Sequence, residues 1–229
     1  MSAESATEPG AHPSPIENSE LPSRETIHTI HHRTVLDKDG QAHQLGSLYS
    51  GSGVAKRVLV IFVRHFFCGS CQEFLRTLSN SITPEALLPH QTSIAVIGCG
   101  DPGLIEVYGR ETGCRFPIYT DPTRQLYHDL GLVSTWDLGP QPDYIKKSMP
   151  RIVIESIVQA LKHVPSGLAH KGGDSKQIGG EFLFEPVEAG SAEGEGAEKQ
   201  VTWFHRMTTT RDHTEVPELK KVLGIGTQR

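Results

Sequence analysis

The stretch RVLVIFVRHFFCGSCQEFL, residues 57–75, decides the fold of this chain. Its first part, RVLVIFV at 57–63, is a continuous apolar run behind one arginine, which is typical of a central strand covered on both faces. Two cysteines separated by two residues, Cys68 and Cys71, follow this run. A helix is predicted from about Cys68 onward, because four residues recur at spacings that place them on one buried stripe: Cys71, Leu75, Leu78 and Ile82.

Strand and helix patterns alternate on both sides of this stretch. Before it, residues 32–45 predict a β-hairpin with Asp39-Gly40 at its turn. After it, two segments begin with Asp-Pro, as an N-cap and first helical residue do, and end at a glycine. The predicted order is a strand at 93–100, a helix at 101–113, a strand at 116–120, a helix at 121–131, strands at 181–187 and 200–207, and a helix at 216–225.

This alternation predicts an α/β fold, a central mixed sheet flanked by helices. A length of 229 residues suits one domain, expected at 25–229. Residues 1–24 are polar and rich in Pro, Ser and Glu, and we expect a disordered tail there. Within the domain, an insertion is expected at about 134–180, with a helix at about 148–163. The acidic, low-complexity segment 188–199 predicts a flexible loop.

The composition excludes several classes of function. A formal net charge of −5 does not indicate a nucleic-acid-binding surface, which would need a basic excess. No apolar run approaches the ~20 residues of a membrane span, and the N-terminus lacks the pattern of a signal peptide. We therefore expect a cytoplasmic location, where four cysteines do not indicate a disulfide framework. No cofactor is expected, since the chain has no P-loop or GxSxG pattern.

The two cysteines are predicted to differ in chemistry. Cys68 stands where the central strand ends and the helix begins, the edge at which α/β sheets gather functional groups. Unpaired N–H groups and the helix dipole favour a thiolate there, and such cysteines have lowered pKa values. Arg64 and His65 are expected to add positive charge if the turn brings them near. Cys71 belongs to the buried stripe, so we expect Cys68 to be the more exposed thiol.

This arrangement predicts a redox pair. Cys68 would attack an electrophile, and Cys71 would then attack the resulting adduct and form a disulfide. Two alternatives stay open, a zinc site and two inert buried thiols. Zinc would need two more ligands, and Cys99 and Cys114 are not a close pair, so no metal is expected. Cys99 ends a strand that should neighbour the central one, which allows it a minor resolving role.

Several segments together resemble a known family. VLVIFVRHFFCGSCQEFL at 58–75, the segment 93–132 with its IYTDP motif, and VTWFHR at 201–206 are similar to thioredoxin-like AhpC/TSA antioxidant-domain proteins of the peroxiredoxin-like 2 family. The resemblance covers about residues 30–225. It implies a thioredoxin-like (peroxiredoxin-like) fold, with Cys68 as the nucleophile and Cys71 as its partner.

The resemblance also has departures. Typical peroxiredoxins carry Pro seven residues, and Thr or Ser three residues, before the reacting cysteine, and Ile61 and His65 stand there. Gly179-Gly180 stands where thioredoxins have a cis-proline. The resemblance therefore implies a thiol redox fold, with at most weak peroxide reduction.

Three functional hypotheses follow. The first is a thiol-disulfide oxidoreductase in antioxidant chemistry, reset by a thiol reductant such as the thioredoxin or glutathione system. The second is an enzyme of the same fold acting on a small organic substrate, such as a lipid endoperoxide or a secondary metabolite, with 134–180 as a pocket wall. The third is a non-enzymatic, redox-sensitive binding module.

Overall fold

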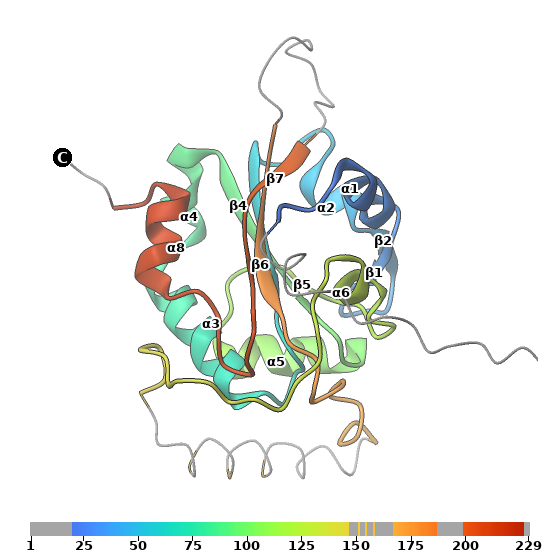
Figure 1. Ribbon diagram of the computed structural model, residues 1–229, viewed down its shortest axis with the longest axis vertical. Coiled ribbons are helices and arrows are strands. Elements are labelled where there is room, and N and C mark those ends of the chain that lie inside the picture. The colour runs from blue at the N-terminus through green and yellow to red at the C-terminus, as the bar shows by residue number, and fades with distance from the viewer. Residues whose placement is uncertain are drawn as a thin grey trace, which may run out of the picture.

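A seven-stranded sheet lies between two layers of helices in the computed structural model, which describes residues 20–146, 151, 154, 158, 167–186 and 199–226 (Figure 1). The strand order across the sheet is β2-β1-β5-β4-β3-β6-β7. The strands are β1 (Thr34–Leu36), β2 (Ala42–Gln44), β3 (Arg57–Phe62), β4 (Thr92–Gly98), β5 (Ile118–Thr120), β6 (Gly180–Pro186) and β7 (Lys199–Arg206).

The sheet is mixed, as the sequence predicts. β3 pairs in parallel with β4, and β4 with β5, whereas β6 runs antiparallel to β3 and β7 runs antiparallel to β6. The strand that carries the apolar run is thus the central one, and its residues 58–62 are fully buried. The predicted α/β, thioredoxin-like class with a central mixed sheet is confirmed.

Helices cover both faces of the sheet (Figure 1). One layer packs on the apolar core that includes Leu59 and Ile61, and the other on the core that includes Val58 and Val60. The first layer holds α3 (Gly69–Ser81), α4 (Pro84–Leu87), α5 (Ile105–Thr112) and α8 (Val216–Leu223), and the second holds α1 (Arg24–His31), α2 (Gly46–Tyr49) and α6 (Gln125–Asp129). Two short 3-10 turns, η2 (Leu88–His90) and η3 (Pro102–Leu104), join helices and strands.

Helix α1 was not predicted from the sequence. Ser23 caps it, because its hydroxyl accepts a hydrogen bond from the Thr26 N–H at 3.1 Å. Only Ile27 and Ile30 turn into the core, which is too short an apolar pattern to indicate a helix by itself. His28 and His31 belong to this helix, and His31 Nδ1 lies 3.2 Å from the Tyr49 hydroxyl.

The two Asp-Pro helix starts differ from the prediction in detail. Asp101 caps the 3-10 turn η3, which continues into α5 and ends at Gly113 as expected. Asp121 does not begin a helix. Its carboxylate accepts hydrogen bonds from the N–H groups of Arg124 and Leu126, and Arg124 has a left-handed backbone with φ of 61°. The helix therefore starts later than predicted, at α6.

Several predicted segments lie outside the described residues. These are the tail up to residue 19, most of the helix at 148–163, and the loop up to residue 198. Among the residues that the structure describes, no helix combines the length and the apolar character that a membrane span requires.

Candidate active site

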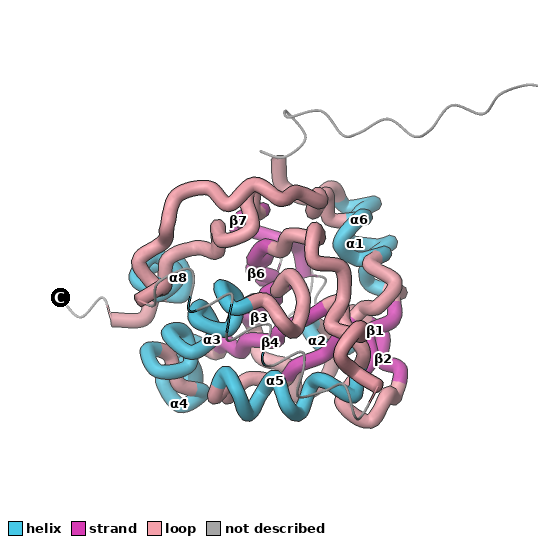
Figure 2. The backbone as a smooth tube through the Cα atoms, turned by 90° about the horizontal axis from the view of Figure 1, so that it is seen from below, coloured by secondary structure: helices cyan, strands magenta, loops and turns pink. Residues whose placement is uncertain are grey.

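Cys68 lies at the junction that the sequence predicts, after β3 and at the N-cap of α3. Its backbone is extended, with φ of −75° and ψ of 105°, and its Sγ accepts a hydrogen bond from the Cys71 N–H at 3.4 Å. The junction is at the end of the sheet to which the parallel strands point their carboxyl ends. Viewed from below, loop segments lie across this end (Figure 2).

Arg64 holds the Cys68 sulfur from the other side. Its Nη1 lies 3.3 Å from Cys68 Sγ and donates to the Thr210 carbonyl at 3.0 Å. Its Nη2 donates to the Ser175 carbonyl at 2.5 Å, and its Nε to the Gln177 carbonyl at 3.3 Å. Three backbone carbonyls from two distant segments therefore orient a buried guanidinium toward the sulfur.

These contacts separate the two thiols in acidity. Burial disfavours the Cys68 thiolate, but a hydrogen bond from the Cys71 thiol, the charges of Arg64 and His65 and the Cys71 N–H outweigh burial and hold the pKa of Cys68 well below that of an ordinary thiol. Burial, together with the hydrogen bond to Cys68 and its charge, raises the pKa of Cys71. The two shifts have opposite directions, so the site favours the thiolate at Cys68 and the protonated thiol at Cys71.

His65 supplies less charge than the sequence suggests. Burial is the largest influence on its ring and lowers its pKa, and the charge of Arg64 acts in the same direction, whereas the charge of Cys68 opposes both. The ring therefore adds positive charge beside Cys68 only when it is protonated. Arg64 is the fixed positive group of this site, because a guanidinium stays charged in proteins.

Cys68 is the more exposed of the two thiols, as expected, but only by a small margin. It is 4% exposed and Cys71 is 0% exposed, so both thiols are buried. The segment 171–178 folds back over the turn that follows β3, and Phe66 N–H donates to the Gly172 carbonyl at 2.9 Å. Such long-range packing leaves no local pattern, so the sequence alone could not show it.

Cys99, to which the sequence allows a minor resolving role, lies beside the site. Its Sγ donates to the Arg64 carbonyl at 2.8 Å, and burial raises its pKa to about 12. Cys114 faces the Phe116 carbonyl at 3.6 Å, and burial raises its pKa as well. Both thiols are therefore protonated at neutral pH, and their pKa values shift in the direction opposite to that of Cys68.

Sequence reasoning missed two sets of residues around this site. The carbonyls that hold Arg64 belong to the backbone, so no side-chain pattern could reveal them. The second set is a buried pair, Glu181 on β6 and His213 before α8, joined at 2.6 Å. A charged residue at the start of the otherwise apolar EFLF segment was the available signal for Glu181.

The described residues offer no alternative site of metal chemistry near the thiols. Across the parts of the chain that the structure describes, no three His, Cys, Asp or Glu side chains gather in a way that could hold a metal ion.

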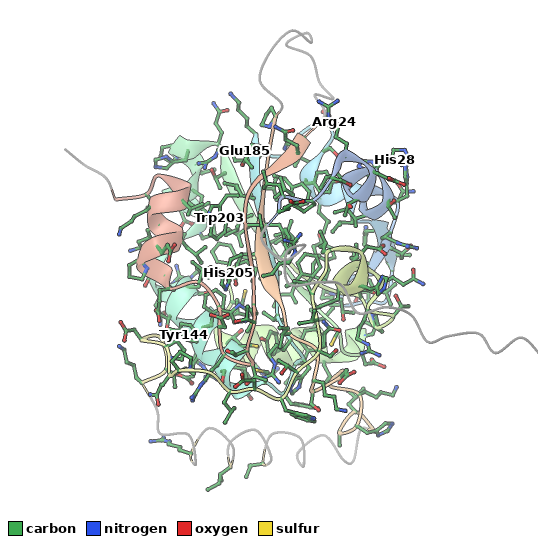
Figure 3. All side chains as sticks on the ribbon, in the orientation of Figure 1. Arg24, His28, Tyr144, Glu185, Trp203 and His205 are labelled. Atoms are coloured by element: carbon green, nitrogen blue, oxygen red, sulfur yellow. The ribbon has the colours of Figure 1, made fainter. Side chains whose placement is uncertain are left out.

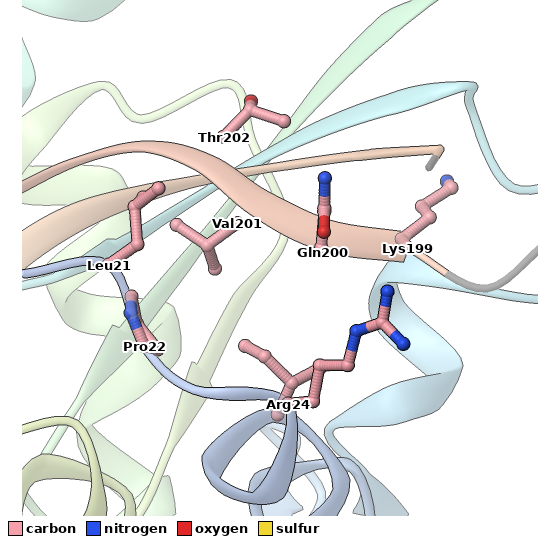
Figure 4. A pocket seen from close by; sticks show the side chains of 8 residues that line it. Leu21, Pro22, Arg24, Lys199, Gln200, Val201 and Thr202 are labelled. Carbon is pink, nitrogen blue, oxygen red and sulfur yellow. The ribbon is translucent and has the colours of Figure 1, made fainter. Parts of the chain in front are cut away.

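A cavity of about 300 Å³ lies between residues 21–27 and the start of β7 (Figure 4). The cavity lies at the first end of β7, and Arg206 is at the other end. Arg206 pairs with Gly180, which pairs with Phe62 at the end of β3. The cavity is therefore remote from Cys68.

Comparison with known proteins adds an independent finding. Residues 77–193, just over half of the chain, match the model of the AhpC/TSA antioxidant enzyme family, and the match begins after Cys71. Human Peroxiredoxin-like 2C is 28% identical over 193 residues, covering 83% of this chain and 77% of that protein. The bovine (Bos taurus) Peroxiredoxin-like 2C is 25% identical over 217 residues, covering 94% and 87%. Among solved structures, Peroxiredoxin Q of Xanthomonas campestris has a TM-score of 0.49 and 11% identity, covering 91% and 97%.

Proposed function

The chain belongs to the AhpC/TSA antioxidant enzyme family, and from this premise we propose that it is a thiol-disulfide oxidoreductase whose nucleophile is Cys68. Family membership supports redox thiol chemistry in general. The observation that carries the specific proposal is the contact of Arg64 Nη1 with Cys68 Sγ at 3.3 Å, beside a hydrogen bond from the Cys71 N–H. Both contacts favour a thiolate at neutral pH, which is the reactive form of cysteine.

The proposed reaction has two steps and then a reset. The Cys68 thiolate attacks a peroxide oxygen, the O–O bond breaks, the leaving oxygen takes a proton, and Cys68 becomes a sulfenic acid. The Cys71 sulfur then attacks the Cys68 sulfur, its proton leaves with the hydroxyl as water, and a disulfide forms. With a disulfide substrate, the Cys68 thiolate displaces one thiol of the substrate and forms a mixed disulfide. Cys71 then attacks the Cys68 sulfur, and the second thiol leaves instead of water. Two electrons from a thiol reductant restore both cysteines.

Peroxide reduction in this scheme is slow. The developing charge on the leaving oxygen needs placed donors, and one such donor is typically worth about 10²–10³ in rate. Ile61 and His65 stand where a typical peroxiredoxin has proline and a hydroxyl residue. The preferred substrates in this proposal are therefore a disulfide or a reactive peroxide. The protein acts in the cytoplasm, and the thioredoxin or glutathione system serves as its reductant.

A single set of variants tests the proposal. Reduced protein is alkylated at neutral pH and the sites are mapped by mass spectrometry, with Cys68 expected to react before Cys71, Cys99 and Cys114. Oxidation should remove two hydrogens and yield a Cys68–Cys71 peptide pair, and Cys68→Ser should abolish turnover with a thiol reductant. Cys114→Ser is the matched control and should retain turnover. Full turnover in Cys68→Ser would reject the proposal.

One observation favours an organic substrate as a second candidate. Trp136 and Leu138 are 61% and 52% exposed, and their segment touches the loop that holds Arg64, since Thr210 N–H donates to the Asp137 carbonyl at 2.7 Å. Exposed apolar side chains on a segment that is hydrogen-bonded to this loop suit an apolar substrate. Comparing turnover of hydrogen peroxide with turnover of a lipid hydroperoxide, in wild type and Trp136→Ser, separates the two candidates.

A further inference from the structure

Glu181 and His213 form a fully buried ionisable pair on the side of the sheet that carries α3. His213 Nδ1 lies 2.6 Å from one carboxylate oxygen of Glu181, and both side chains are 0% exposed. The Thr214 hydroxyl donates to the other carboxylate oxygen at 3.0 Å. The His213 ring stacks on the Phe74 ring of α3, with centroids 4.2 Å apart and planes 6° apart.

Such a pair is unusual in an apolar core. Removing two ionisable groups from water costs several kcal/mol per ion, and apolar residues of the same volume are often as stable. His213 Nε2 is also buried and has no hydrogen-bond partner among the described residues. Each buried polar atom without a partner calls for an explanation. The thiol chemistry proposed above does not use this pair.

The contacts of the segment 207–214 offer an explanation for the buried pair. This segment joins β7 to α8, and its Thr210 carbonyl accepts the hydrogen bond from Arg64 Nη1. The same nitrogen lies 3.3 Å from Cys68 Sγ. The position of the Thr210 carbonyl therefore helps to decide whether the guanidinium points at the sulfur.

The pair attaches the far end of this segment to the sheet. Glu181 lies in β6 and pairs with Ile61 of β3, so its carboxylate is fixed by the centre of the fold. At the near end, the Met207 N–H donates to the Gly179 carbonyl at 3.0 Å. The segment is thus held at one end to β6 and at the other end to the residue that precedes β6.

A third anchor ties the segment to the neighbouring loop. The Tyr144 hydroxyl donates to the Arg211 carbonyl at 2.7 Å and accepts from the His213 N–H at 3.2 Å. Tyr144 lies toward the lower end of the molecule, whereas Glu185, four residues beyond Glu181, lies toward the other end of β6 (Figure 3). The anchors therefore gather at the end of the sheet where Cys68 lies.

We propose that Glu181 and His213 are positioning residues for the reacting thiol: their pair fixes the segment 207–214, the Thr210 carbonyl fixes Arg64, and Arg64 holds Cys68 as a thiolate. This inference rests on the proposed role of Cys68 and deepens it. Loss of the pair lets the segment shift, and the Arg64 guanidinium then spends less time against the sulfur. The Cys68 thiolate is stabilised less, although neither residue touches it.

The experiment measures the alkylation rate of Cys68 in the full chain against pH, with the site mapped by mass spectrometry. Glu181→Gln keeps the shape of the side chain and removes its charge. We expect the apparent pKa of Cys68 to rise by about one unit, which slows alkylation below that pKa about 3-fold, since a more basic thiolate is intrinsically more reactive. His31→Gln is the matched control, because it removes a hydrogen-bonded imidazole on the opposite face of the sheet.

A double-mutant cycle separates positioning from general damage. In an Arg64→Met background, Glu181→Gln should produce no further change in the Cys68 profile, because the connection to the sulfur is already lost. Thermal unfolding of each variant is recorded alongside. If Glu181→Gln does not fold, Thr214→Val removes only the hydroxyl bond to the carboxylate and serves the same cycle, with a smaller shift in the same direction.

The outcomes distinguish this inference from the proposed function. An unchanged Cys68 profile in Glu181→Gln, or an equal shift with and without Arg64, overturns the inference alone. If the wild-type protein forms no Cys68–Cys71 disulfide, the proposed function fails whatever the variants do. A shift in Glu181→Gln that disappears in the Arg64→Met background supports the inference.

Discussion

Replacing Arg64 by methionine is the perturbation that addresses the site most directly. The change removes the guanidinium that lies 3.3 Å from Cys68 Sγ and leaves an apolar side chain of adaptable shape in the buried space. The backbone N–H of Cys71 and the N-terminus of α3 still face the sulfur. The variant therefore isolates the share of thiolate stabilisation that comes from Arg64.

The size of the effect follows from the contact. A hydrogen bond to a charged group is worth about 1.5–3 kcal/mol, and one pKa unit corresponds to 1.36 kcal/mol, so the pKa of Cys68 should rise by about 1–2 units. Thiolate reactivity increases with basicity, with a Brønsted coefficient of about 0.4–0.5. Alkylation well below the pKa should therefore slow by about 3- to 16-fold. Above the pKa of the variant, the same thiolate should react faster than that of the wild type.

The assay is the pH profile of Cys68 alkylation from about pH 4 to about pH 10, a range that spans the values found for reactive cysteines. Wild type and Arg64→Met should give curves that cross. Arg64→Lys keeps a charge but loses the fixed fork of donors, and should lie between them. Arg76→Met is the matched control, because it removes an arginine from α3 that pairs with Glu73 and does not touch Cys68.

A second readout is the reduction potential of the Cys68–Cys71 disulfide. Arg64 stabilises the reduced form, so its loss should lower the potential by about 30 mV for each 1.4 kcal/mol. The alkylation profiles of wild type and Arg64→Met could instead coincide, or differ by the same factor at every pH. Either result would refute the conclusion that the contact with Arg64 stabilises the Cys68 thiolate.

Three further outcomes are expected. Gly179→Ala should destabilise the protein by about 3 kcal/mol in thermal or chemical unfolding, because the new Cβ would collide with the Phe62 carbonyl, whereas Gly109→Ala, with 3.4 Å to its nearest neighbour, should be tolerated. The free energy of unfolding of the reduced protein should fall as pH rises above about 8.5, because burial raises the pKa of Cys99 to about 12 and the thiol ionises first in the unfolded chain. In urea unfolding, Cys99→Ala should reduce the slope of this free energy against pH, and an unchanged slope would contradict the prediction. His65→Thr should speed oxidation of the protein by hydrogen peroxide in stopped-flow measurements, since a compact hydroxyl can donate to the peroxide; a slower or equal rate would show that the ring itself performs this task.

Local patterns in the sequence were sufficient for the framework. The apolar run at 57–63 predicts β3, and the stripe from Cys71 to Ile82 predicts α3 and the burial of Cys71. Hairpin and late strands follow from the same alternation. These features are encoded by neighbours in the chain, because periodicity and turn residues act over a few positions.

Short elements escaped this kind of inference. α1 has only Ile27 and Ile30 in the core, and its stability comes from packing rather than from its own pattern. The start of α6 shifted because the Asp121 carboxylate binds several backbone N–H groups of a turn before the helix begins. In both cases tertiary contacts outweigh the local signal.

The sequence by itself determined that two cysteines stand at the junction of the central strand and its helix, with Arg64 and His65 beside them. Only the tertiary structure decided which groups surround the two sulfurs. It buried Cys68, assigned the fixed charge to Arg64, and brought the carbonyls of Ser175, Gln177 and Thr210 around the guanidinium. Backbone carbonyls carry no sequence signature, and contacts across more than a hundred residues form only when the sheet assembles. That is why the position of the cysteine pair and the lowered pKa of Cys68 could be predicted from the sequence, while the contacts that hold Arg64 against the sulfur could not.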